Sequence, residues 1–342
     1  MVNVNNEWGK LKEVIVGTVD NANMPTHGKD LHCINYATDD SIPKNELGFW
    51  DQKVYDETYE DLENLSNLLT DVGVKVYRPS PIDTTKTISN GHWETSQYYT
   101  FCPRDTVTVI GNNIIESAMS LRSRQYETDC FKDIFIEKME QGANWVAAPK
   151  PRLLDSMYQR EDLSIPTLLD GEPVFDAANV IKHNNDLLYL VSNTGNKTGA
   201  EWLERYCKEN FGEEYNVNLA ENVYAYIHID TTFVFVGEGK VLLNPTRVNE
   251  FIIPEFLKPF DKIWAPEPYP TQVLDNWCPA SPWLGMNILP INDKLIMVEE
   301  HQTLLMKELK RFGIDTIPVR MRHARTFSGG PHCVTLDVVR GE

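Results

Sequence analysis

The sequence of 342 residues predicts an α/β fold in which one strand–helix–strand pattern recurs about five times. Runs of β-branched and aromatic residues predict the strands. Apolar residues spaced three and four positions apart predict amphipathic helices between them. If the repeats are equivalent, they are expected to pack radially around a central axis, where a site gathers residues from several repeats.

Each repeat begins with an apolar strand or hairpin, continues with a helix and ends with a short strand near a proline or a charged residue. In chain order, the predicted segments are 13–17, 56–70 and 74–79; 106–110, 131–139 and 144–149; 187–191, 201–211 and 215–217; 232–236, 241–243, a short helix and 262–266; and 294–298, 301–312 and 316–319. The last helix shows this spacing, with apolar residues at Leu304, Leu305, Leu309 and Phe312. The spacing of the repeats is irregular, which leaves an open α/β sheet as the alternative fold.

Composition and charge limit the classes of partner. The formal net charge is −18, which disfavours nucleic acid, because nucleic acid binding needs a cationic surface. No apolar run approaches the roughly 18 residues that span a bilayer, and the N-terminus lacks the basic stretch and apolar core of a signal peptide. We therefore expect a cytoplasmic protein with small-molecule substrates, no nucleic-acid or membrane partner, and reduced cysteines.

The cysteines contain one candidate nucleophile. The chain has six, none of them in a C-x-x-C pair or with zinc-ligand spacing, so no metal site is expected. Cys333 follows Gly329 and Gly330, which permit close backbone approaches, and precedes a predicted strand. It is either a thiol lining a cleft or a buried, inert cysteine. Neighbouring side chains on a strand alternate between faces, so His332 is expected to be structural.

A histidine and two carboxylates are candidates for acid–base chemistry. Residues 223–230 are predicted to form a strand, which would place His228 and Asp230 on one face. They are either an acid/base with a cation-binding group or a hydrogen-bonded pair at a strand edge. Asp176 has apolar neighbours. Its carboxylate is interpreted either as a partner that orients a histidine or as a helix or turn cap.

Two further charged residues, Asp105 and Arg247, complete a set of side chains suited to chemistry on a guanidinium group. Asp105 precedes a predicted strand and Arg247 follows one, and each taken alone is interpreted as a solvated loop charge. A guanidinium group is a planar cation that carboxylates clamp, and an amino-acid carboxylate pairs with arginine. Cleaving a guanidinium C–N bond needs a nucleophile for carbon and a proton for the departing amine.

These residues lie in sequence blocks that make the chain similar to the arginine-dependent amidinotransferases, the family of glycine amidinotransferase and the bacterial inosamine-phosphate amidinotransferases. The likeness covers nearly the whole chain. Its blocks are residues 6–8 and 13–17, Pro103-Arg104-Asp105, 148–151, 172–178, His228-Ile229-Asp230, Asn244-Pro245-Thr246-Arg247 and Gly329-Gly330-Pro331-His332-Cys333. The chain departs from the family at Pro331, where phenylalanine is usual, and at Ala280, which replaces one serine of a usual pair.

The resemblance implies a fold and a set of roles. The fold would be a five-bladed α/β propeller of ββαβ modules with pseudo-five-fold symmetry, as in arginine deiminases, and residues 1–342 would form one catalytic domain. The implied roles are nucleophile for Cys333, general acid and base for His228, orientation of that histidine for Asp176, guanidinium binding for Asp105 and Asp230, carboxylate binding for Arg247, and substrate contact for Ser281.

The implied activity is a ping-pong transfer of the amidino group from L-arginine to an amine, without metal or organic cofactor. Glycine is favoured as acceptor because it is the commonest in the family, and an inosamine phosphate or lysine remains open. The rival functions are an arginine-deiminase-like hydrolase of the same fold and a non-catalytic binding module. The oligomeric state is open, with a homodimer as one option.

Overall fold

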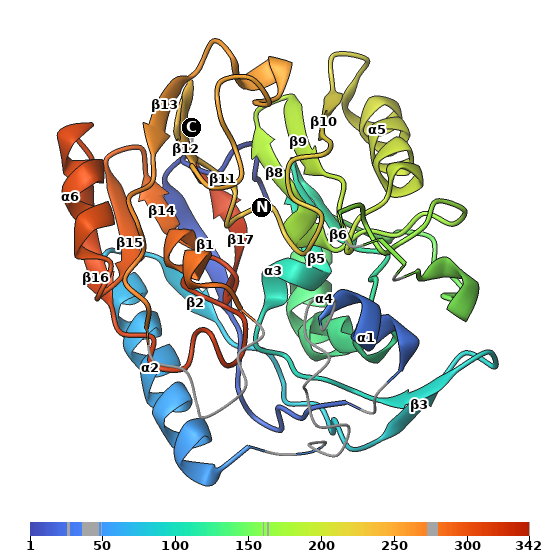
Figure 1. The fold of residues 1–342 in the computed structure, drawn as a ribbon. Helices are drawn as coiled ribbons and strands as arrows, with labels where there is room; N and C mark the ends of the chain where they lie inside the picture. Colours follow the sequence, from blue (N-terminus) through green and yellow to red (C-terminus); the bar gives the residue numbers. More distant parts are fainter. Residues whose placement is uncertain are drawn as a thin grey trace.

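The structure is a computed structural model that describes residues 1–25, 28–35, 48, 50–159, 161–162, 164–271 and 280–341. Cys278 lies outside the described residues, and the other cysteines are buried. The described part consists of sheets and helices that alternate along the chain (Figure 1). Among the described residues, no helix combines the length and the apolar character that a membrane span requires.

Five three-stranded sheets share one topology, in which the middle strand pairs antiparallel with one neighbour and parallel with the other. The sheets are β17 (Thr335–Arg340), β1 (Leu11–Val16) and β2 (Lys75–Tyr77); β5 (Val107–Ile110), β6 (Asn113–Glu116) and β7 (Asn144–Ala147); β8 (Val180–His183), β9 (Asp186–Leu190) and β10 (Asn216–Ala220); β11 (Phe233–Gly237), β12 (Lys240–Leu243) and β13 (Asp261–Trp264); and β14 (Leu289–Asn292), β15 (Leu295–Glu299) and β16 (Asp315–Val319). A separate hairpin joins β3 (Thr87–Ser89) and β4 (Glu94–Ser96).

Helices connect the middle and third strands in four of these sheets, because a parallel pair needs a crossover connection. They are α2 (Gln52–Asp71), α4 (Lys132–Glu140), α5 (Lys197–Phe211) and α6 (Thr303–Arg311). In the β11–β13 sheet, the predicted short helix is a single 3-10 turn, Glu255–Leu257. Pro254 and Pro259 flank this turn, and proline limits helical continuation on either side. The short helix α1 (Lys29–Ile34) lies between β1 and β2, ahead of α2, and the short helix α3 (Pro103–Thr106) directly precedes β5.

The first and last strands of the chain share one sheet. Leu11 to Val16 in β1 pair antiparallel with Thr335 to Arg340 in β17, and Figure 1 shows both strands near the middle of the view. The buried clusters join successive sheets, for example Ile15 and Leu336 with Val109. This pairing places the C-terminal segment that carries Cys333 beside the start of the chain.

Candidate active site

The seven predicted site residues line two adjoining pockets. Cys333, His228, Asp230, Arg247 and Ser281 line a pocket of about 400 Å³ of empty space. Asp105, Asp176 and, again, His228 line a second pocket of about 340 Å³. The two pockets share Ile227, His228 and Ser328, so His228 stands at their junction. The predicted residues therefore meet in space although they are spread over more than two hundred positions of the chain.

Cys333 lies in a turn ahead of β17, and its side chain is 2% exposed. It is buried, yet it lines the first pocket. The two glycines before it are required sterically, since a Cβ on Gly329 would lie 2.5 Å from Cys102 Sγ and a Cβ on Gly330 would lie 2.9 Å from Asn287 Cβ. Only glycine allows the turn to approach so closely.

The surroundings of Cys333 favour the protonated thiol in the free protein. Its Sγ donates to Asp230 Oδ2 at 3.2 Å. The neighbouring Cys102 thiol, burial, and the charges of Asp230 and Asp105 raise the pKa of Cys333 well above its ordinary value. Positive charge brought into the pocket would offset the two carboxylates and favour the thiolate.

His228 is placed by an irregular segment, so the strand predicted over residues 223–230 is wrong. Its backbone has φ of 53°, a left-handed conformation that is uncommon for a residue other than glycine. Hydrogen bonds from distant segments hold this turn, including Ile229 N to Ala178 O at 3.0 Å. The common direction of His228 and Asp230 toward one pocket therefore comes from tertiary contacts and not from strand alternation.

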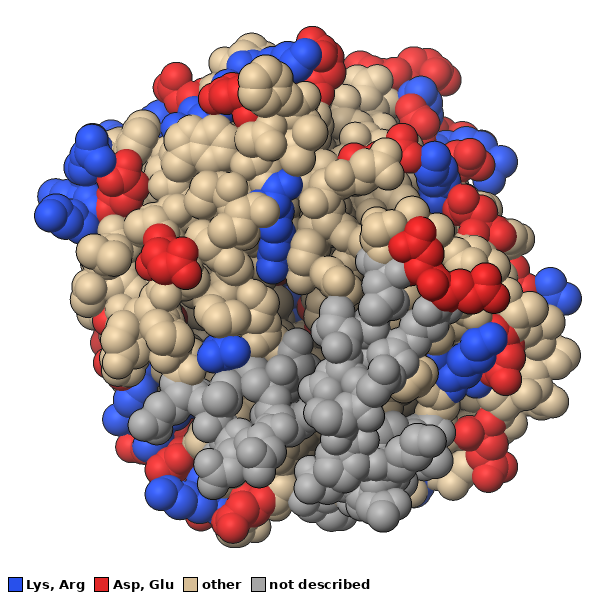
Figure 2. Space-filling view, viewed as in Figure 1, with Lys and Arg blue, Asp and Glu red and all other residues tan. Residues whose placement is uncertain are grey.

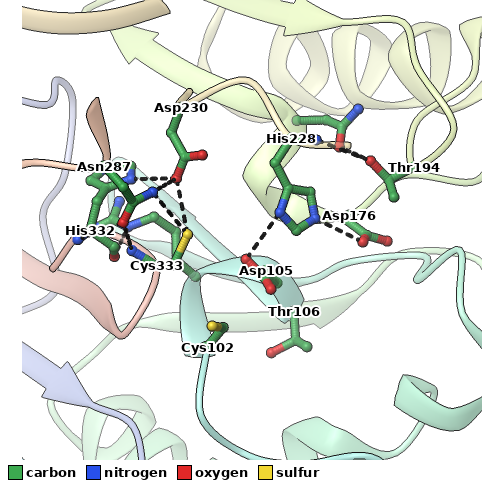
Figure 3. A network of polar contacts seen from close by, with 12 residues as sticks. Cys102, Asp105, Thr106, Asp176, Thr194, His228, Asp230, Asn287, His332 and Cys333 are labelled. Atoms are coloured by element: carbon green, nitrogen blue, oxygen red, sulfur yellow. Dashed lines mark hydrogen bonds and ion pairs between the residues drawn. The ribbon is translucent and has the colours of Figure 1, made fainter. Parts of the chain in front are cut away.

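The imidazole of His228 lies between two carboxylates (Figure 3). Nε2 is 3.1 Å from Asp176 Oδ2, and Nδ1 is 3.6 Å from Asp105 Oδ1. Burial opposes a charge on this ring, but Asp105 and then Asp176 outweigh it and raise the pKa of His228 to about 9. The ring therefore carries a proton at neutral pH and can donate it. Asp176 accepts from Ser120 N and Oγ, each at 2.9 Å, so its carboxylate is held against the imidazole, and its side chain makes no cap hydrogen bond to the 3-10 turn that follows it.

Asp105 is buried in α3, which overturns its interpretation as a solvated loop charge. Arg124 Nη1 lies 2.7 Å from its Oδ2, and Glu127 accepts from the same guanidinium. Asp105 Oδ1 has no hydrogen-bond partner among the described residues. Burial raises the pKa of Asp105, although His228 and Arg124 oppose the rise. A buried acceptor without a partner is costly unless a ligand supplies the donor.

Asp230 is the centre of the polar cluster around the thiol. Its Oδ2 accepts from Asn287 Nδ2 at 2.7 Å and lies 3.0 Å from His332 Nδ1. Burial alone would raise the pKa of Asp230. The nearby His332 and, after it, His228 outweigh this effect, so the pKa of Asp230 is lowered. The expectation that His332 and Cys333 point to opposite faces is wrong, because the strand begins only at Thr335. In the turn before it, both side chains reach the same carboxylate.

Arg247 is a half-buried cation at the first pocket and not a solvated loop charge. Its Nη1 donates to Thr231 O, Thr231 Oγ1 and Thr232 Oγ1 at 3.0, 2.7 and 2.9 Å. Its guanidinium carbon lies 3.5 Å from the ring centroid of Tyr224. Ser281 caps the 3-10 turn Pro282–Met286 and accepts from Trp283 N at 3.2 Å. Figure 2 shows a hollow near the middle of this face, with basic side chains beside it.

Sequence reasoning missed three residues of the site. Asn287 contacts Cys333 and Asp230, Arg124 holds Asp105, and Cys102 lies next to the candidate nucleophile. A polar residue in the apolar run that leads into β14 was the available signal for Asn287. Nothing local distinguished Arg124 from a surface arginine.

Curated proteins similar to the chain along its length are amidinotransferases, while no family model matches it. Inosamine-phosphate amidinotransferase 1 of Streptomyces griseus is 41% identical over 99% of this chain and 97% of its own length. The L-arginine:L-lysine amidinotransferase of Pseudomonas savastanoi pv. phaseolicola is 32% identical over 98% and 93%. The mitochondrial glycine amidinotransferase of Gallus gallus is 32% identical over 98% and 82%.

Solved structures agree with this likeness. The inosamine-phosphate amidinotransferase of Streptomyces griseus superposes with a TM-score of 0.96 at 40% identity, covering 100% of this chain and 97% of that one. The dimethylarginine dimethylaminohydrolase of Pseudomonas aeruginosa superposes with a TM-score of 0.62 at 13% identity, covering 96% and 99%. At that identity the second likeness concerns the fold alone.

Proposed function

Because the chain belongs to the arginine-dependent amidinotransferases and is an enzyme that transfers amidino groups, we propose that it takes the amidino group from L-arginine through a bond to Cys333. The observation that carries this proposal is the meeting of a thiol, a histidine with a raised pKa and three buried carboxylates at two adjoining pockets. The arrangement offers a nucleophile, a proton donor and a cradle for a planar cation.

The guanidinium of arginine would lie between Asp105 and Asp230. Asp105 Oδ1 is buried and accepts no hydrogen bond from the described residues, and Asp230 Oδ2 lies 3.2 Å from the sulfur. Carboxylates on two sides can each accept N–H bonds from a guanidinium. The bound cation offsets the charges that hold Cys333 protonated, so substrate binding promotes loss of the thiol proton to solvent and leaves the thiolate.

The transfer takes two half-reactions. The Cys333 thiolate bonds to the guanidinium carbon, the C–N bond to the side chain of arginine breaks, and His228 gives its proton to the nitrogen that leaves with ornithine. The acceptor amine then loses a proton to His228 and attacks the amidino carbon, and the C–S bond breaks to restore the thiolate. Asp176 keeps the imidazole in place through both steps. Covalent catalysis splits one difficult substitution into two easier ones.

Arg247 is proposed to bind the carboxylate of arginine, with Ser281 beside it in the same pocket. Replacing Arg247 by alanine is expected to raise KM for arginine about 10- to 100-fold, since a charge-assisted hydrogen bond is worth about 1.5–3 kcal/mol. Steady-state kinetics with arginine and with agmatine, which lacks the carboxylate, check this role. An equal loss of kcat/KM on both substrates would show that Arg247 does not bind the carboxylate.

The acceptor is proposed from the relatives. Glycine is the acceptor expected from the family as a whole, but identity to the inosamine-phosphate enzymes reaches 40–41%, against 32% for the chicken glycine enzyme and the bacterial lysine enzyme. We therefore place an inosamine phosphate first among the acceptors to test, with glycine and lysine next.

The experiment is incubation with arginine labelled at the guanidinium carbon and a panel of amines, followed by mass spectrometry. Ornithine and a labelled guanidino product of one acceptor are the expected results. Labelled citrulline formed without any acceptor would instead support the hydrolase. If neither product forms and the arginine stays intact, the result would support the non-catalytic binding module.

The architecture supports the same proposal. We infer that the five sheets are the blades of an α/β propeller and that residues 1–342 form one catalytic domain. The sheets share one topology, the buried clusters join successive sheets, and β1 pairs with β17 to join the chain ends. A ring of this kind explains why residues from several repeats meet at one site.

A further inference from the structure

The buried side chain of Asn287 connects the turn that carries Cys333 to the carboxylate of Asp230. Asn287 follows the 3-10 turn Pro282–Met286 and is 1% exposed. Its Nδ2 donates to Cys333 Sγ at 3.0 Å and to Asp230 Oδ2 at 2.7 Å. Its Oδ1 accepts from the backbone N–H groups of His332 at 3.1 Å and Cys333 at 3.0 Å.

These contacts determine which end of the amide faces the sulfur. Two backbone N–H groups point at one end and need an oxygen there. A carboxylate oxygen and a sulfur lie at the other end, where both amide protons find acceptors. The reversed amide would face donor with donor and acceptor with acceptor, so the hydrogen-bond network excludes it. All four hydrogen bonds of the amide are thereby used at the nucleophile.

We propose that Asn287 is a positioning residue for the nucleophile: its oxygen holds the turn that aims Cys333, and its N–H stabilises the charged sulfur. This inference rests on the proposed role of Cys333. A hydrogen bond to an ionised acceptor is stronger than one to its neutral form, so a donor directed at sulfur favours thiolate over thiol. Asp230 and Asp105 act in the opposite sense, which makes a fixed donor at this position valuable. Figure 3 shows the amide beside the sulfur, on the side away from His228.

The substitution Asn287→Asp separates the two halves of this role. One carboxylate oxygen can still accept from the two backbone N–H groups, while the other replaces the donor that faces sulfur and Asp230. The turn keeps its support and the thiolate loses its stabilising N–H. The titratable groups around the sulfur are Asp230, Asp105, Cys102, His332 and His228; the substitution keeps all of them and adds one carboxylate, whose charge also disfavours the thiolate.

The expected result is a rise of about one to two units in the thiol pKa of Cys333, which means roughly 10- to 100-fold slower alkylation below the midpoint. The measurement is the pH dependence of iodoacetamide labelling at Cys333, read by peptide mass spectrometry. It needs no turnover and no acceptor. It therefore reports on Asn287 even if the proposed amidino transfer is wrong, in which case the acceptor panel fails while the labelling shift remains.

Asn196→Asp is the matched control. Asn196 is also buried, accepts from two backbone N–H groups (Val174 and Gly199) and donates to two carbonyls (Leu169 and Glu172). Its substitution removes a similar pair of donors and should leave the alkylation midpoint of Cys333 unchanged. An unchanged midpoint in folded Asn287→Asp, or an equal shift in both variants, would overturn the proposal.

A second measurement tests the proposal without the substitution, in case Asn287→Asp does not fold. In the unsubstituted protein labelled with 15N-asparagine, the Asn287 side-chain amide resonance should titrate with the midpoint of Cys333 alkylation. It should also stop titrating after Cys333 is alkylated. A resonance that is independent of the state of Cys333 would contradict the hydrogen bond to sulfur.

Discussion

Replacing Cys333 by alanine is expected to abolish the release of ornithine from arginine, with a rate loss on the order of 10⁴-fold or more. The sulfur is the atom that would bond the amidino carbon, and no other described thiol lines the first pocket. Rapid-quench measurement with labelled arginine and no acceptor tests this directly. The unsubstituted enzyme should release ornithine in a burst matching the enzyme concentration, with the label retained on the peptide that contains Cys333.

Cys207→Ala is the control for this variant. Cys207 is buried in the cluster beneath α5, where burial raises its pKa to about 12. It should therefore remain a neutral thiol, and its loss should leave the burst unchanged. Full activity in folded Cys333→Ala would disprove covalent catalysis through this residue. If Cys333→Ala keeps the burst and the label is found on another residue, that residue is the nucleophile.

Replacing His228 by glutamine is expected to slow the first half-reaction by about 10²- to 10⁴-fold, the usual effect of general acid–base catalysis. Glutamine can hydrogen-bond to Asp176 but cannot deliver a proton to the departing amine. An arginine analogue with an alkylthio leaving group needs no such proton. The variant should process that analogue with a much smaller loss, measured as the rate of thiol release. Equal losses on both substrates would remove His228 from the proton-transfer step.

The pH dependence of the same step has a defined sign. The pKa of His228 is about 9 because Asp105 and Asp176 outweigh the effect of burial, so the ring is charged at neutral pH. The burst rate should fall as pH rises through about 9, where the imidazolium loses its proton. Asp176→Asn should lower the His228 pKa by about 1–3 units, observed by NMR titration of the ring. A midpoint near the ordinary value of histidine in the unsubstituted enzyme would contradict this assignment.

Local sequence patterns were sufficient for many of the regular elements, although not for the irregular segment around His228. The apolar stripe of α6 (Thr303–Arg311) and the β-branched run of β11 (Phe233–Gly237) gave their type from side-chain spacing alone. The recurring pattern also predicted five similar units, which match the five three-stranded sheets. The pairing of β1 with β17 was beyond such reasoning, because periodicity contains no information on partners more than three hundred residues apart.

At the site, the difference between what local sequence patterns predict and what depends on distant contacts is larger. The family resemblance pointed to Cys333, His228 and Asp176 as candidates, while the local pattern predicted the wrong structure for one of them, since the strand expected around His228 is an irregular segment with a left-handed backbone at that residue. That segment exists because distant segments hydrogen-bond to it.

The sequence by itself determined which residue types were present, the periodicity of the elements and the membership of the family. Only the tertiary structure decided that Asp105 is buried with one oxygen that accepts no hydrogen bond from the described residues, that Asp105 and Asp176 raise the pKa of His228, and that Asn287 faces the sulfur. The physical reason is that burial, charge pairing and hydrogen-bond direction depend on neighbours in space, and these neighbours come from different repeats of the chain.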